Sequence, residues 1–241
     1  MKKTNTLIAL LASMTLATAG VELVTAPAEE VVSTSLTTGY ASDSVFRGVD
    51  QGQNDAEAVL TTDISLPADI NLTVDAAYSK MDSSVTDEEA TELSAEFSKS
   101  VADYLISLSY TWNSNGYVGE PSPTQEIGIS VQRAVGPVTV EFTQYIGLEG
   151  DNNGYSEVAA LYSDDFGVLP VVLDFRTELG YLTQDAAFTH IGAQISTDLP
   201  VVENVIARPF VAYNHQLGGE FASGVSSNDG FFGGVLFTRA F

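Results

Sequence analysis

The residues best placed to do chemistry in this sequence are charged side chains spaced two apart within apolar segments. In residues 171–181, Asp174, Arg176 and Glu178 occupy alternate positions, which places all three on one face of a β-strand. Similar patterns elsewhere assign more charged residues to a polar face. The candidate pore-lining residues are Arg47, Glu57, Asp63, Asp75, Glu92, Glu96, Glu126, Arg133, Glu141, Asp174, Arg176, Glu178 and Arg208, and Lys99 has the same predicted orientation. If this face lined a closed sheet, the lumen would be mixed but net acidic and would prefer cations.

His190 and His215 are the two histidines of the chain, and a catalytic triad would require one of them. Their polar neighbours Thr189 and Asn214 are poor partners, because adjacent residues of a strand point to opposite faces. The sequence contains no HExxH, GxSxG or phosphate-loop pattern. We therefore predict no catalytic residues and a protein that is not an enzyme.

Two acidic segments, residues 82–89 and 149–154, offer carboxylates to a metal ion. Hard divalent cations take oxygen ligands, but the spacing in residues 82–89 does not match a Ca²⁺ loop with glycine at its turn. Both segments are better explained as solvated acidic loops, or as loops that meet divalent-bridged glycolipid at a cell surface. We predict no metal site and no cofactor.

Alternation with period two runs along almost the whole chain and predicts an all-β protein. In residues 104–112, for example, Ile106 and Leu108 fall on one face and Ser107 and Ser109 on the other. The predicted strands cover residues 34–48, 56–66, 70–80, 91–100, 104–112, 125–133, 138–147, 155–163, 171–182, 188–197, 204–215 and 230–241.

The connectors between these strands alternate in length. The mostly short ones are residues 67–69, 101–103, 134–137, 163–170 and 198–203. The others, mostly longer, are residues 49–55, 81–90, 113–124, 148–154, 183–187 and 216–229. Long loops at one end and short turns at the other are typical of outer-membrane barrels. The predicted fold is a single up-and-down antiparallel transmembrane β-barrel of about twelve strands, with both termini on the periplasmic side.

A soluble exported β-barrel that binds an apolar ligand also has alternating strands, with the apolar face inside. Two features favour the membrane. Aromatic residues gather near strand ends, as in the girdles of membrane barrels: Tyr78, Phe97, Tyr104, Trp112, Phe142, Tyr162, Phe175, Tyr181 and Tyr213. The chain also ends on Phe241, in phase with Phe237 and Val235, like the terminal strands that barrel assembly machinery reads. Arg239 shares this face, which is tolerable if its side chain reaches the periplasmic rim.

The N-terminus has the features of a secretory signal peptide. Lys2 and Lys3 precede an apolar run and then small residues, and we predict cleavage after Ala28, with Ala19 as the alternative. Residues 1–28 are thus the signal peptide and residues 29–241 the barrel. There is no cysteine, which excludes a disulfide framework and a lipoprotein anchor.

The formal net charge of −23 makes nucleic acid an implausible partner, because affinity for phosphate backbones comes from Lys and Arg. The acidity either attracts cations to the protein or reflects a saline habitat. At 44% apolar residues, the composition is not that of a disordered acidic chain.

Arg47 lies inside a predicted strand, which makes sense only if it faces a wet or charge-paired interior. With Phe46 towards lipid, Arg47 points inward, where carboxylates such as Glu57 or Asp63 could pair with it. At the bilayer midplane a lipid-facing arginine would cost about 2–4 kcal/mol.

The segment Ser42-Asp43-Ser44-Val45-Phe46-Arg47-Gly48-Val49-Asp50-Gln51 resembles the N-terminal signature of a family of bacterial outer-membrane porins, long known as conserved hypothetical proteins. That signature reads Ser-Asp-aromatic-x-Phe-Arg-Gly-aliphatic-Ser-Gln. Ser44 replaces the usual aromatic residue and Asp50 the usual serine. The resemblance covers about ten residues, implies a barrel with a pore, and carries over no catalytic residue.

The sequence therefore predicts an exported protein of the bacterial outer membrane that acts as a porin-like passive channel for small hydrophilic solutes, with a preference for cations. Two alternatives stay open: a non-conducting structural or adhesion barrel, whose interior charges pair across strands, and the soluble ligand-binding barrel. Expected partners are the lipid bilayer and the barrel assembly machinery, and the sequence is compatible with an oligomer.

Overall fold

The structure is a computed structural model that describes residues 32–46, 49–82, 87–114, 123–148, 154–167, 171–183, 186–217 and 229–241. Arg47, the predicted signal peptide and the acidic loop residues 83–86 and 149–153 lie outside the described residues. Among the residues described, no helix is long and apolar enough to cross a membrane.

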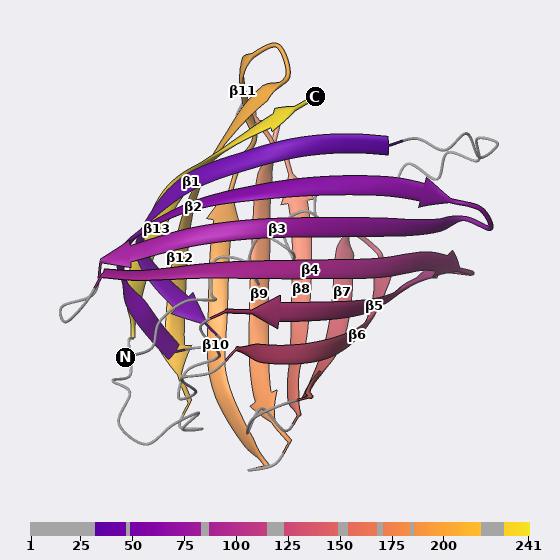
Figure 1. The fold of residues 1–241 in the computed structure, drawn as a ribbon, viewed down its shortest axis with the longest axis horizontal. Coiled ribbons are helices and arrows are strands. Elements are labelled where there is room, and N and C mark those ends of the chain that lie inside the picture. The colour runs from indigo at the N-terminus through magenta and orange to yellow at the C-terminus, as the bar shows by residue number, and fades with distance from the viewer. Residues whose placement is uncertain are drawn as a thin grey trace.

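The described chain forms one antiparallel sheet that closes on itself (Figure 1). Its strands are β1 (Val32–Phe46), β2 (Val49–Leu66), β3 (Ile70–Asp82), β4 (Asp87–Val101), β5 (Tyr104–Asn113), β6 (Thr124–Val135), β7 (Val138–Gly147), β8 (Tyr155–Asp164), β9 (Leu173–Leu182), β10 (Ala187–Ser196), β11 (Leu199–Val202), β12 (Val205–Gln216) and β13 (Gly230–Ala240). Each strand pairs with the next in sequence except β10, which pairs with β12 and not with β11, and β1 pairs with β13. The result is a closed barrel of twelve strands, which confirms the predicted fold class, with β11 as a short addition paired only with β12.

The two walls of the barrel cross steeply in Figure 1, where β1 to β4 run across the view and β8 to β10 run nearly perpendicular behind them. Strongly tilted strands produce this crossing, because a closed sheet needs tilt and stagger to join its edges. A closed barrel also pairs every backbone group without leaving an exposed sheet edge.

All twelve predicted strands are present, with ends that differ by a few residues. The main differences are at β2, β3 and β4, which extend into segments 49–55 and 81–90 that we had expected to be loops. Sheet hydrogen bonds use the backbone, so polar segments can continue a strand after the apolar alternation ends. Only residues 47–48 separate β1 from β2, and only residues 83–86 separate β3 from β4. The difference in connector length between the two ends of the barrel is therefore smaller than predicted. β11 lies within the predicted connector 198–203 and was missed.

Side-chain burial alternates along the strands as the period-two pattern requires. In β5, Ser107 is 2% exposed and Leu108 is 51% exposed. The C-terminal strand follows the same rule, because Leu236 is buried while Phe231 and Phe237 are exposed. The exposed face of the barrel is apolar and the enclosed face is largely polar.

One part of the enclosed face is apolar. Side chains from β1, β2, β3, β12 and β13 pack there into a cluster of Ala41, Val59, Ala77, Phe210, Ala212, Leu236 and Phe232. The interior of the barrel therefore has an apolar side and, further round through β4 to β10, a polar side.

Candidate functional site

The candidate functional site is the enclosed polar face of the barrel, beginning with the carboxylates of β2 and β3. Thr61 donates a hydrogen bond to Asp75 Oδ1 over 2.7 Å, and Ser94 of β4 donates to Asp75 Oδ2 over 3.2 Å. Thr73 donates to Asp63 Oδ1 over 2.7 Å. Hydroxyl groups on neighbouring strands thus solvate these carboxylates without neutralising them.

The carboxylates of β4 to β7 lie deeper in the interior. Glu92, Glu126 and Glu141 are 7%, 3% and 7% exposed. Asn113 donates a hydrogen bond to Glu92 Oε2 over 3.1 Å, and Thr143 donates to Glu141 Oε1 over 3.2 Å. From β2 to β6 this wall carries carboxylates, and no arginine or lysine with a described side chain points inward from it.

Arg176 of β9 is the main positive charge inside the described barrel. Its Nη2 lies 2.7 Å from Glu157 Oε1 on β8, and its Nε lies 2.9 Å from Glu178 Oε2 on the same strand. Its Nη1 lies 3.8 Å from Glu141 Oε2 on β7. The Arg176 side chain is only 9% exposed, so these ion pairs are poorly screened by solvent. We call Arg176, Glu141, Glu157 and Glu178 the Arg176 cluster.

A β-bulge in β10 adds His190 to this cluster. The register shifts between Phe188 and Ile191, so that Thr189 and His190 are both 1% exposed and both point inward. Gly180 lies beside them, where a Cβ would come 2.6 Å from His190 Nδ1. A bulge places two residues opposite one, and the glycine leaves room for the second side chain.

The bulge fixes the position of the imidazole. His190 Nε2 lies 3.5 Å from Glu178 Oε1, and Thr189 Oγ1 lies 3.0 Å from His190 Nδ1. The ring stacks on Tyr155, with centroids 6.4 Å apart and 7° between the planes. Tyr155 in turn donates a hydrogen bond to Glu157 Oε2 over 3.0 Å.

The geometry of Glu157, Glu178 and His190 resembles a metal site, because one potential ligand atom from each lies within 4.8 Å of the others. However, the Arg176 guanidinium already binds both carboxylates. A divalent cation between them would meet this fixed positive charge at short range. The arrangement is therefore an ion-pair cluster and not a metal centre.

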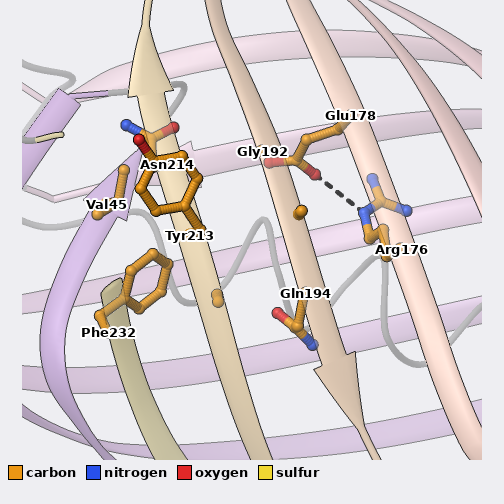
Figure 2. A pocket seen from close by; sticks show the side chains of 10 residues that line it. Val45, Arg176, Glu178, Gly192, Gln194, Tyr213, Asn214 and Phe232 are labelled. Atoms are coloured by element: carbon orange, nitrogen blue, oxygen red, sulfur yellow. Dashed lines mark hydrogen bonds and ion pairs between the residues drawn. The ribbon is translucent and has the colours of Figure 1, made fainter. Parts of the chain in front are cut away.

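A small cavity lies next to the cluster, enclosed by β9, β10 and β12 with contributions from β1 and β13 (Figure 2). Figure 2 shows Glu178 and Arg176 on one side and Val45, Asn214 and Phe232 on the other. Its volume of about 30 Å³ is enough for about two water molecules.

Three predicted site residues lie outside the enclosed polar face or outside the described chain. Arg133 is on the outer face, with its guanidinium carbon 5.0 Å from the centroid of the Tyr104 ring, and so does not point inward as predicted. Lys99 also points outward, opposite Ile106 in the sheet register. No bulge interrupts β6 or β4, so these residues cannot share a face with Glu126 or Glu96. For Arg47 the structure gives no placement.

Arg208 and Asp174 point to the enclosed face as predicted, and each contacts a residue that the sequence analysis did not name as its partner. Arg208 bonds Asp198 beyond the end of β10, with Nε 2.5 Å from Oδ1. Asp174 accepts a hydrogen bond from Ser163 over 2.6 Å. In the register of β1 and β2, Glu57 lies opposite Gly39 and Asp63 lies opposite Ser33. The expected pairing of these carboxylates with Arg47 stays a prediction, because Arg47 lies outside the described residues.

Sequence reasoning missed Glu157, Asp55 and Asp198 as polar-face residues. Glu157 follows the alternation in residues 155–163 and could have been found from it. Asp55 and Asp198 lie in segments that we had assigned to connectors. Thr189 was placed opposite His190, whereas the bulge turns both inward.

Comparison with known proteins places the fold among outer-membrane β-barrels. The chain is similar to the KdgM porin, with 12% identity over 86% of this chain and 99% of the porin, at a TM-score of 0.50. The same values hold for the KdgM porin in complex with disordered oligogalacturonate. A structure reported in work on the in meso crystallisation of membrane proteins matches at 9% identity and a TM-score of 0.50, over 88% of this chain and 84% of that one. No protein-family model matches the sequence, and no curated protein matches it.

Proposed function

We propose that this protein is an outer-membrane β-barrel that acts as a narrow passive channel for small cations and other small hydrophilic solutes. The proposal includes export by the signal peptide in residues 1–28, and assembly through the C-terminal strand β13. It includes no enzymatic activity.

The outer surface supports a place in the membrane. Large apolar side chains are exposed around the barrel, among them Leu60, Phe97, Leu108, Ile129, Phe142, Val158, Phe188, Ile195 and Val211. Soluble monomers rarely expose a continuous apolar surface of this kind, whereas membrane barrels require one. The soluble ligand-binding alternative would instead need this face to be enclosed.

The charge of the enclosed face is the observation that carries the proposed cation preference. Carboxylates on β2 to β9 face inward, while the inward guanidinium groups of the described chain are those of Arg176 and Arg208. Both arginines are bound to carboxylates, whereas Asp63 and Asp75 accept hydrogen bonds from the neutral hydroxyl groups of Thr73 and Thr61. An excess of fixed negative charge attracts cations and repels anions.

The same charge argues against an acidic solute. One KdgM structure with this fold was obtained with oligogalacturonate, whose repeating unit is an acid. Passage of a polyanion requires positive groups along its path, and in this barrel the carboxylates predominate. We expect the substrate range to differ from that of KdgM.

A non-conducting structural barrel is the second candidate function. The observation in its favour is the deep burial of interior polar side chains such as Ser107, Asn113 and Glu126, which are 2%, 0% and 3% exposed. Wide water-filled pores leave such groups wet. If the barrel conducts, the bore is therefore narrow and the Arg176 cluster is its main obstruction.

Two measurements test the proposal. The full chain, expressed in a Gram-negative host, should fractionate with the outer membrane and migrate differently on gels before and after heating. Refolded protein in a planar bilayer should produce discrete current steps. A protein that stays in the soluble fraction would contradict the membrane assignment, and a folded, inserted barrel without current would favour the structural role.

A further inference from the structure

We infer that Glu57, together with Asp55 and Ser79, forms a binding site for a hard divalent cation such as Ca²⁺ on the inner wall of the barrel. Glu57 is 6% exposed, and neither of its carboxylate oxygens has a hydrogen-bond partner within the described part of the chain. Asp75, Glu92 and Glu141 differ from it, because each accepts a hydrogen bond from a neighbouring side chain.

The sheet register places two more oxygen-bearing side chains beside Glu57. Ser79 of β3 lies directly opposite, is 2% exposed, and has a hydroxyl without a hydrogen-bond partner among the described residues. Asp55 lies two positions along β2 on the same face and is 1% exposed. On the other side Glu57 faces Gly39, which contributes no side chain.

The surroundings make an uncompensated charge costly. Ala41, Val59 and Ala77, which are 0%, 4% and 3% exposed, occupy the neighbouring inward positions and belong to the apolar cluster of the interior. A carboxylate buried among such groups needs a bound cation or a proton to offset its loss of hydration. A second carboxylate two residues away increases that need.

No lysine or arginine side chain in the described part of the chain compensates the charge of the Glu57 carboxylate. Arg176 is bound to Glu157 and Glu178, and Arg208 is bound to Asp198. Lys80 is close in sequence to Ser79 but is exposed and points to the outer face, opposite Ala56. A cation from solution can supply this compensating charge.

The available ligands select the type of cation. Two carboxylates and a hydroxyl are hard oxygen donors, the ligand type that Ca²⁺ prefers. The net charge of −23 also raises the local concentration of cations around the protein. This site does not depend on the barrel being conductive, because a closed barrel would present the same three side chains.

Calcium binding to the detergent-solubilised full-length barrel tests the inference. After treatment with EDTA, titration with CaCl₂ at pH 7 should reveal a saturable site by calorimetry, and Ca²⁺ should raise the unfolding temperature. Glu57→Gln should weaken binding by about tenfold or more, since ligand charge sets the affinity of such sites. Glu92→Gln is the matched control, because Glu92 is equally buried but accepts a hydrogen bond from Asn113.

Three results would overturn the inference. They are an absence of Ca²⁺ binding to the wild-type barrel, binding that Glu57→Gln leaves unchanged, and equal losses in Glu57→Gln and Glu92→Gln. The first would mean that Glu57 is protonated, and the last that the acidic lumen attracts calcium diffusely. If Glu57→Gln does not fold, Ser79→Ala is used instead, because this variant keeps the carboxylates of Glu57 and Asp55. It should weaken binding, and unchanged affinity in Ser79→Ala would also contradict the site.

Discussion

Gly180 lies against His190: a Cβ at position 180 would come 2.6 Å from the imidazole Nδ1 and would also collide with Thr189 Oγ1. The glycine thus permits the bulge that turns His190 towards Glu178. Without it, the ring could not occupy its place beside the Arg176 cluster. The packing of the barrel interior at this point requires glycine at position 180.

Gly180→Val should destabilise the barrel by about 1–3 kcal/mol, the usual range for overpacking a filled interior. Unfolding in urea, followed by the heat-modifiable gel shift, measures the effect. Ala193→Val is the control, because Ala193 faces outward from the adjacent strand β10. Equal stability of Gly180→Val and the wild type would show that the interior has room that the structure does not indicate.

Arg176→Met should destabilise the barrel by about 3–5 kcal/mol, because it leaves buried carboxylates without their counter-charge. Arg133→Met provides the comparison: Arg133 is 47% exposed and lies 3.7 Å from Asp103, so its loss should cost about 0–1 kcal/mol. The same urea titration measures both. Similar small losses for the two variants would mean that the Arg176 cluster is well hydrated.

Leu108→Arg tests which face meets lipid. Leu108 is 51% exposed on the outer surface of β5, and arginine at the bilayer midplane should cost about 2–4 kcal/mol and impair assembly. Val135→Arg is the control, because Val135 is 57% exposed at the end of β6, where the expected cost is about 0–1 kcal/mol. Outer-membrane yield and the gel shift report assembly, and unimpaired Leu108→Arg would contradict the membrane-facing surface.

The contact between His215 and Asp229 should make stability depend on pH in the acid range. Hydrogen bonds from the Gln216 backbone N–H and from His215 lower the pKa of Asp229 below its usual value of 3.8. A lowered carboxyl pKa adds stability that is complete above the unfolded-state pKa and lost as the pH falls through the folded-state pKa.

The wild type should therefore unfold at a higher temperature than Asp229→Ala at pH 7, and the gap should close as the pH falls below 3.8. Thermal unfolding in detergent at several pH values measures this gap. A difference that persists at the lowest pH would assign the effect to packing instead of to the ionised carboxylate.

The strands could be predicted because burial on one face forces period two, and that pattern is clear in segments such as residues 104–112. The pattern does not mark where a polar strand ends, which is why β2 and β4 were predicted too short. β11 was missed because its four residues are exposed on both faces and so show no alternation.

The polar face was predicted less well than the strands. Arg176 and Glu178 could be assigned to one face from spacing alone, but the contacts to Glu141 and Glu157 depend on the register of three strands, which spacing does not specify. Arg133 was wrongly assigned to the polar face, because it is seven residues from Glu126 in an uninterrupted strand and so lies on the opposite face. The bulge at His190 could not be predicted, since it shifts the alternation without a sequence pattern that we recognised.

The reversal potential in a planar bilayer is the most direct test of the proposed passage of ions along a net acidic lumen. With the refolded wild type under a KCl gradient, we predict discrete current steps and a reversal potential shifted towards that of potassium. Asp75→Asn should reduce the shift, because Asp75 is an interior carboxylate solvated by Thr61 and Ser94 and not by a cation. A reversal potential of zero, or one shifted towards that of chloride, would contradict the proposed preference for cations.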